Sequence, residues 1–132
     1  MSDVLDLPLR NEHDVVAARQ LVRNVMQQHR FSLVDQTKLV TAASELARNA
    51  IIHGGGGSMR CETGVYEGRI CVRLTFEDQG PGIPDLSLAM KDGWTSGGGL
   101  GMGLPGSKRL VNEFALDSKP GRGTRVTVAR WK

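Results

Sequence analysis

The sequence predicts an α/β sandwich, in which a mixed, mostly antiparallel sheet carries helices packed on one face. Apolar residues alternate in some segments, as in strands, and recur with a helical period in others. The order of these segments along the chain is β-α-α-β-β-α-β-β, which is typical of a layered α/β domain. With 132 residues, 39% of them hydrophobic, the chain has the size of one domain, residues 1–132, with one modest core.

Two long helices are expected near the N-terminus, over residues 13–29 and 32–53. Ser32 and Asp35 form a capping pair at the start of the second helix. A third helix is expected from Pro105 to about Phe114, because proline suits the first turn of a helix, and residues 85–90 are expected to form a short one. Each long helix has one apolar stripe: Val15, Ala18, Val22 and Val25 in the first, and Leu39, Ala43, Leu46 and Ala50 in the second.

Strands are expected at residues 5–9, 58–66, 69–78, 115–118 and 124–131. A two-residue turn at 67–68 would join the second and third strands into a hairpin, with Tyr66 opposite Arg69 and Met59 opposite Phe76. In that register Cys61 points toward the core and Cys71 points away from it, so the two cysteines are not expected to form a disulfide. Two cysteines also make neither a disulfide framework nor a zinc site.

Composition excludes some classes of function. The net charge is +3 and no basic run is present, so nucleic-acid binding is not indicated. The first residues carry no basic segment followed by an apolar one, and no stretch is apolar enough to span a membrane. We therefore expect a cytoplasmic protein with neither a nucleic-acid nor a membrane partner.

The most informative segment is the end of the third expected strand, where Asp78 closes an apolar alternating run and Gly80 and Gly82 follow. A carboxylate at the end of a buried strand is costly unless it has a partner, and glycine allows close approach of the backbone to a ligand. Glu45 and Asn49 lie four residues apart and therefore on one face of the second helix, beside its apolar stripe. Taken singly, each feature also fits an ordinary turn or a solvated helix face.

Four motifs in a fixed order favour a functional interpretation. They span residues 45–54, 77–85, 97–106 and 121–124, and they resemble the N, G1, G2 and G3 boxes of the GHKL (Bergerat-fold) superfamily, which includes gyrase, Hsp90, histidine kinases and MutL. The resemblance covers nearly the whole chain. It is closest to bacterial partner-switching serine/threonine kinases of the stressosome switch type, which are related to anti-sigma-factor kinases. A phosphate-binding G-x-x-x-x-G-K-[ST] loop is absent from the sequence.

The resemblance implies ATP and Mg²⁺ as cofactors and assigns a role to each matching residue. Glu45 would be the general base toward the acceptor hydroxyl, and Asn49 would bind the metal ion through its amide oxygen. Asp78 would accept a hydrogen bond from the adenine amine, with Gly80, Gly82 and Thr124 also near the base. The phosphates and the lid would involve Gly97, Gly98, Gly99, Leu100, Gly101, Met102, Gly103 and Leu104.

The resemblance also implies partners. We expect a protein serine/threonine kinase that phosphorylates a STAS-domain antagonist protein in a stress-signalling partner switch. A PP2C-type phosphatase regulatory domain is a second expected partner. The alternative is an anti-sigma factor that sequesters an alternative sigma factor, with kinase activity toward an anti-anti-sigma factor.

Overall fold

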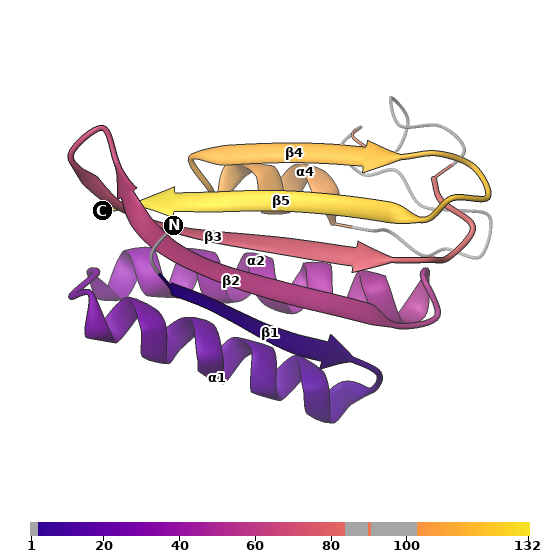
Figure 1. Ribbon diagram of the computed structural model, residues 1–132, viewed down its shortest axis with the longest axis horizontal. Coiled ribbons are helices and arrows are strands. Elements are labelled where there is room, and N and C mark those ends of the chain that lie inside the picture. The colour runs from indigo at the N-terminus through magenta and orange to yellow at the C-terminus, as the bar shows by residue number, and fades with distance from the viewer. Residues whose placement is uncertain (1–2, 84–89, 91–102) are drawn as a thin grey trace.

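The computed structural model describes residues 3–83, 90 and 103–132. Five strands form one sheet in the order β1-β2-β3-β5-β4 (Figure 1). Each pairing between neighbouring strands of this sheet is antiparallel, so the predicted α/β sandwich is confirmed with an antiparallel rather than a mixed sheet. The strands are β1 (Asp3–Leu9), β2 (Gly57–Tyr66), β3 (Arg69–Asp78), β4 (Glu113–Ser118) and β5 (Thr124–Trp131).

The helices α1 (Glu12–Gln28), α2 (Leu33–Ile52) and α4 (Leu104–Arg109) lie on one side of the sheet. The predicted cap of α2 is confirmed, because the Ser32 side chain accepts a hydrogen bond of 3.1 Å from the Asp35 amide. α2 contacts α1, α4 and the strands β1, β2, β3 and β5. This central position brings the C-terminal turns of α2 next to the ends of the strands.

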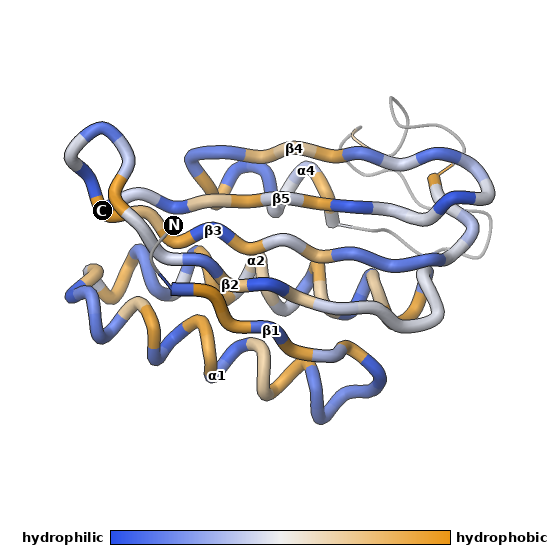
Figure 2. The backbone as a smooth tube through the Cα atoms, in the orientation of Figure 1, coloured by the Kyte–Doolittle hydropathy of each residue, from blue (hydrophilic) through white to orange (hydrophobic). Residues whose placement is uncertain are grey.

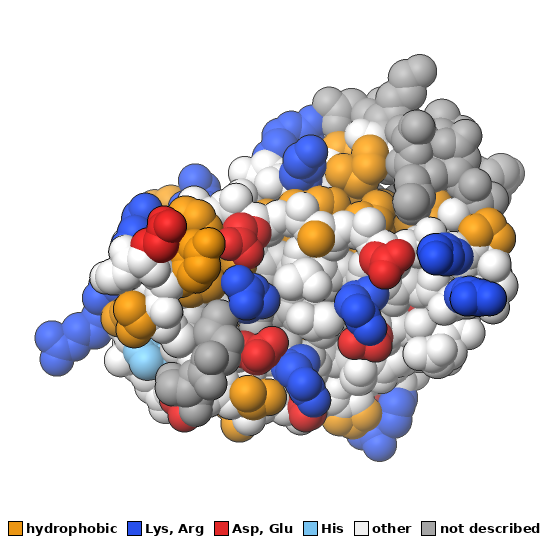
Figure 3. All heavy atoms as spheres, turned by 45° about the horizontal axis from the view of Figure 1, so that its top comes forward, with side chains coloured by type: hydrophobic (Ala, Val, Ile, Leu, Met, Phe, Trp, Pro, Cys, Tyr) orange, Lys and Arg blue, Asp and Glu red, His pale blue; other side chains and the backbone are white. Residues whose placement is uncertain are grey.

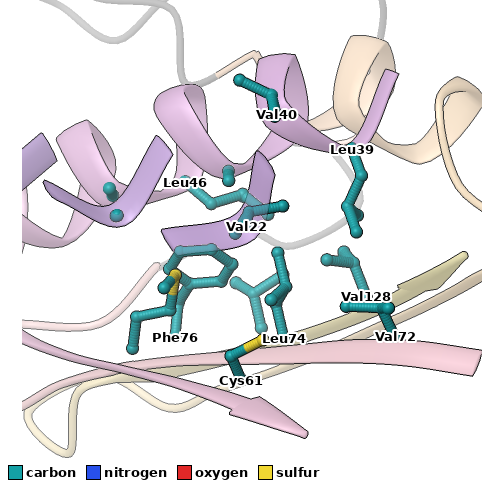
Figure 4. Packing of buried hydrophobic residues seen from close by; sticks show 14 of the residues in the cluster. Val22, Leu39, Val40, Leu46, Cys61, Val72, Leu74, Phe76 and Val128 are labelled. Atoms are coloured by element: carbon teal, nitrogen blue, oxygen red, sulfur yellow. The ribbon is translucent and has the colours of Figure 1, made fainter. Parts of the chain in front are cut away.

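The core lies between the helices and the inner face of the sheet. Figure 4 shows Leu46 on α2 pointing toward Phe76 and Leu74 on β3, and all three side chains are at most 2% exposed. Burying a side chain of this size stabilises the fold by about 1.5–3 kcal/mol. The apolar stripes predicted for both long helices are buried, and the alternation of polar and apolar residues along the strands is visible in Figure 2.

The β2–β3 hairpin has the predicted register, with Tyr66 opposite Arg69 and Met59 opposite Phe76. Glu67 and Gly68 both have positive φ, 51° and 76°, as a two-residue hairpin turn of type I′ requires. The register places Cys61 and Cys71 on opposite faces, and both thiols are free and buried. Cys71 is therefore covered although it points away from the helices.

The third helix is shorter than predicted, because α4 ends at Arg109 and Phe114 belongs to β4. The Asn112 amide donates to the carbonyl of Ala129 over 2.9 Å, and the Asn112 side chain accepts from the Trp131 amide over 2.9 Å. These bonds start the pairing with β5 before a further helical turn can form. Except for Met90, which lies in a turn, the short helix expected over 85–90 is outside the described residues, as is most of the glycine-rich segment.

The outer face of the sheet is polar, and acidic and basic side chains are interspersed on the face shown in Figure 3. Ion pairs join Arg60 to Asp6 over 2.9 Å and Arg125 to Glu77 over 3.3 Å. Exposed pairs of this kind contribute little to stability, but they keep this face compatible with water. Within the described part of the chain, no helix is both long and apolar enough to cross a membrane.

Candidate functional site

The predicted site residues come together where the C-terminal turns of α2 meet the end of β3 and the start of β5, at the right of Figure 1. Glu45 and Asn49 are half-buried on one face of α2, at the edge of the core, as predicted. His53 caps the helix, and its amide donates to the Asn49 carbonyl over 2.9 Å. α2 therefore presents a carboxylate and an amide one turn apart, next to the ends of the strands.

Asp78 lies beside two glycines that leave room for nothing larger. A Cβ placed on Gly54 would collide with the Asp78 carboxyl group, and one placed on Gly80 would lie 2.6 Å from the Gly54 Cα. The Gly80 amide donates to Oδ1 of Asp78 over 2.9 Å. The Asp78 carboxylate is therefore held in one place between the end of α2 and the loop after β3.

Burial raises the pKa of Asp78 above its ordinary value of 3.8. Hydrogen bonds from the backbone at Gly80 and Thr124 and the nearby charge of His53 act in the opposite direction. A half-buried carboxylate whose pKa is shifted by desolvation is typical of a binding or catalytic group.

Two loops close around the backbone at the end of β3. Asp78 pairs directly with Thr124 across the β3–β5 ladder, so both side chains project from the same face of the sheet. Gly82 and Gly123 have positive φ, 77° and 83°, and a Cβ on either would clash with backbone atoms, of Lys119 and Asp78 respectively. These two glycines are therefore required by conformation and by space.

Ser118 is a contributor that the sequence did not single out. Its hydroxyl accepts from the Ile83 amide over 2.8 Å, donates to the Gly123 carbonyl over 3.1 Å and lies 2.8 Å from Oγ1 of Thr124. The signal available in the sequence was its inner-face position at the end of the expected strand, opposite Thr124. Gly54 is part of one of the four motifs, but the motif alone does not indicate its contact with Asp78.

Glu45 lies against the end of the glycine-rich segment. Gly103, the N-cap of α4, has a φ of 64°, and a Cβ there would collide with the Glu45 carboxylate and lie 2.7 Å from its Cγ. The neighbouring Arg48 pairs with Glu12 over 2.9 Å, in a largely exposed ion pair. The structure thus brings the predicted base next to the predicted phosphate-binding loop.

Leu104 is the next predicted residue of that loop. It is 1% exposed and belongs to the core, so it anchors the start of α4. The predicted residues Gly97, Gly98, Gly99, Leu100, Gly101 and Met102 lie outside the described residues.

A cavity of about 310 Å³ opens at the same end of the sheet. The cavity is lined by Asp78, Ser118 and Thr124 from the inner face of the sheet and by Glu77 and Arg125 from the outer face. The cavity therefore extends around the ends of the strands and borders the group of residues that holds Asp78.

Comparison with known proteins identifies the family. Residues 34–132 match the model of the histidine kinase-, DNA gyrase B-, and HSP90-like ATPases. The chain belongs to this family. The predicted superfamily is thereby confirmed, and ATP is the nucleotide expected for a family of ATPases.

Two similar proteins narrow the position within the family. The chain is 46% identical to the serine/threonine-protein kinase RsbT of Bacillus subtilis (strain 168), over 99% of this chain and 98% of that protein. It is 32% identical to the anti-sigma F factor of Bacillus licheniformis, over 86% of this chain and 81% of that protein. These similarities support the predicted protein serine/threonine kinase and its relation to anti-sigma-factor kinases.

Solved structures agree on the fold. The RsbU and RsbW domains of Rv1364c from Mycobacterium tuberculosis match 99% of this chain with a TM-score of 0.69 and 20% identity. This chain spans 33% of that longer protein. The histidine kinase domain from Erythrobacter litoralis EL346 matches 93% of this chain with a TM-score of 0.54, also at 20% identity.

Proposed function

We propose that this family member is an ATP- and Mg²⁺-dependent protein serine/threonine kinase that phosphorylates a STAS-domain antagonist protein in a stress-signalling partner switch. The observation that carries the proposal is the contact between Glu45 and Gly103, which joins a carboxylate to the end of the glycine-rich segment. The 46% identity to a serine/threonine-protein kinase over almost the full length of both chains supports the same function.

In this reaction Glu45 is the general base that acts on the acceptor hydroxyl. Glu45 accepts the proton of the acceptor hydroxyl while the hydroxyl oxygen attacks the γ-phosphorus of ATP. The bond from that phosphorus to the bridging oxygen of the β-phosphate breaks, which releases ADP. The half-buried position of Glu45 at the core boundary restricts its motion and partly shields it from water. Phosphoryl transfer depends mainly on this kind of positioning.

Asn49 fits the metal-binding role. Mg²⁺ binds oxygen ligands and usually takes only one or two protein groups together with phosphates and water. Among the described residues, no cluster of three or more His, Cys, Asp or Glu side chains could hold a metal ion. A site built on the Asn49 amide and the nucleotide phosphates agrees with the small number of protein ligands that Mg²⁺ usually takes. The ion would neutralise charge on the phosphates when bound.

Asp78 would select adenine. Its carboxylate accepts hydrogen bonds, as the exocyclic amine of adenine requires, whereas guanine presents a carbonyl at that position. Gly54 and Gly80 hold the carboxylate in place. Asp78 and Glu45 would then mark the base end and the phosphate end of one bound nucleotide.

The partners follow from the family resemblance. We expect the acceptor to be a serine or threonine of a STAS-domain protein in the cytoplasm. The added phosphate would disfavour docking through its charge and bulk. The released kinase would then bind the regulatory domain of a PP2C-type phosphatase.

The test is to incubate the protein with labelled ATP, Mg²⁺ and each STAS protein encoded in its own genome. Label on a STAS serine or threonine is the expected result. A Glu45→Gln variant should transfer label far more slowly, whereas Glu62→Gln, an isosteric change on the outer face of the sheet, should transfer normally. No labelled STAS protein with any candidate would contradict the proposal.

The similarity to an anti-sigma F factor supports a second function, the sequestration of a sigma subunit. Adding the sigma factors of the same genome to the assay separates the two functions. Tight sigma binding without STAS phosphorylation would favour the anti-sigma alternative.

A further inference from the structure

The hydroxyl group of Ser118 joins three segments at the base end of the site. Ser118 is 8% exposed. Its Oγ contacts the Ile83 amide in the loop after β3, the Gly123 carbonyl in the turn before β5, and the Thr124 hydroxyl at the start of β5. Ile83 is itself buried, so the Ser118 side chain reaches its partners without competition from bulk water.

The number of protons in this cluster limits the directions that its hydrogen bonds can take. A serine hydroxyl has one proton and two lone pairs. Ser118 donates its proton to the Gly123 carbonyl over 3.1 Å and accepts from the Ile83 amide over 2.8 Å. In the arrangement that uses the Ser118 proton for the Gly123 carbonyl, Thr124 donates in the contact of 2.8 Å between the two hydroxyl oxygens.

In that arrangement the Thr124 hydroxyl offers a ligand only lone pairs. Because Thr124 pairs with Asp78 across the ladder, its acceptor oxygen and the Asp78 carboxylate face the same side of the sheet. An ionised carboxylate also accepts and cannot donate. Asp78 and Thr124 therefore both offer acceptors to a ligand, which suits an amino group and disfavours a carbonyl.

We infer that Ser118 is a specificity-determining positioning residue, which favours 6-aminopurine over 6-oxopurine nucleotides by holding Thr124 as a hydrogen-bond acceptor. The inference rests on the proposed ATP-binding function of the same site. Ser118 acts through Thr124. Without the Ser118 hydroxyl, the Thr124 hydroxyl can rotate and donate a hydrogen bond. It can then bind the 6-oxo group of a purine.

The experiment compares the Kd of ATP with that of ITP, whose base carries an oxygen in place of the 6-amino group, by calorimetry. Wild type should prefer ATP. Ser118→Ala should reduce the ratio of the two Kd values by about fivefold, the worth of one neutral hydrogen bond. If Ser118 only supported the local structure, its substitution would weaken the binding of ATP and ITP equally. The ratio of the two Kd values would then stay unchanged, which would overturn the inference.

Three further variants sharpen the test. Ser118→Thr keeps the hydroxyl and should restore the wild-type ratio. In a Thr124→Val background, Ser118→Ala should leave the ratio unchanged, because its effect passes through Thr124; a further fivefold change there would contradict the inference. If Ser118→Ala does not fold, Ser118→Cys, with a weakly hydrogen-bonding thiol of similar size, should lower the ratio instead, and an unchanged ratio would overturn the inference.

Failure of the proposed function would look different. Wild-type protein that binds neither ATP nor ITP would contradict the nucleotide site itself. If wild type prefers ATP and Ser118→Ala prefers it by the same ratio of Kd values, only the role of Ser118 would be contradicted.

Discussion

The Cα of Gly54 lies against the carboxyl group of Asp78, so that no side chain fits between the end of α2 and the end of β3. Gly54 is not among the glycines with positive φ, so space rather than backbone conformation requires glycine here. The contact ties the helix that carries Glu45 and Asn49 to the strand that carries Asp78, the proposed adenine-binding carboxylate.

Gly54→Ala should therefore displace Asp78 and weaken ATP binding. Loss of a hydrogen bond to a charged group costs about 1.5–3 kcal/mol, which corresponds to an increase in Kd of about 10- to 100-fold. Gly106→Ala is the matched control, because Gly106 lies in α4 and a Cβ there meets no atom within 4 Å. Equal Kd values for Gly54→Ala and wild type, measured by calorimetry, would show that the contact does not position Asp78.

ATP affinity should depend on pH through Asp78. Burial raises the pKa of this carboxyl above 3.8, and the protonated form accepts a hydrogen bond from the adenine amine less strongly than the carboxylate does. Binding should weaken as the pH falls through the raised pKa, at a higher pH than an ordinary aspartate would give. Asp78→Asn should bind weakly at every pH, and a wild-type affinity independent of pH down to about 4 would contradict this role.

The raised pKa of Asp78 also affects the stability of the fold. A carboxyl whose pKa is higher in the folded state stabilises folding fully only below its unfolded value, and that stability is lost as the pH rises through the folded pKa. Asp78 thus costs the free enzyme stability at neutral pH. A costly charge retained at this position is consistent with a role in binding.

A second carboxylate, Asp35, has a structural role. Arg130 donates to Oδ1 of Asp35 over 2.7 and 3.1 Å and to the Leu110 carbonyl over 3.1 Å. The hydrogen bonds from Arg130 lower the pKa of Asp35 below 3.8. Both side chains are mostly buried, so the pair joins the start of α2 to β5.

Arg130→Met should lower the free energy of unfolding by about 1–3 kcal/mol at neutral pH, because it leaves a partly buried carboxylate without its partner. For a depressed carboxyl pKa the stabilisation is present above the unfolded value, near 3.8, and is lost as the pH falls through the folded value. The difference between wild type and Arg130→Met in urea unfolding should therefore shrink below pH 3.8. A difference that stays constant in acid would rule out the ion pair as its cause.

Ile52 lies on the face of α2 that carries Glu45 and Asn49, one turn beyond Asn49, and it is 61% exposed. We expect an acceptor protein that reaches Glu45 to cover this surface. Ile52→Asp should raise the KM for the acceptor by about tenfold, as the loss of a buried apolar contact would, and leave the Kd of ATP unchanged. Val16→Asp, a matched change at an exposed position of α1, should leave both constants unchanged; an equal effect of the two variants would argue against docking at Ile52.

Most of the fold was predictable because local signals determined it. The two-residue turn at Glu67 and Gly68 fixed the hairpin register, and Ser32 fixed the start of α2. The end of α4 was not predictable from helix signals alone, because it depends on hydrogen bonds from Asn112 to a distant strand.

The candidate site divides in the same way. The one-turn spacing of Glu45 and Asn49, beside an apolar stripe, is enough to predict that both residues lie at the core boundary. The contacts of Gly54 and Ser118 depend on how α2, β3 and the turn before β5 pack together. Such tertiary contacts leave no periodic signal in the sequence.

We propose above all that Glu45 serves phosphoryl transfer rather than nucleotide binding. Single-turnover transfer of labelled phosphate from ATP to the STAS acceptor, measured for wild type and Glu45→Gln alongside the Kd of ATP, tests it most directly. We expect an unchanged Kd and a transfer rate lowered by about 10²–10⁴-fold. Full transfer by Glu45→Gln, or a loss of ATP binding equal to the loss of rate, would contradict this proposal.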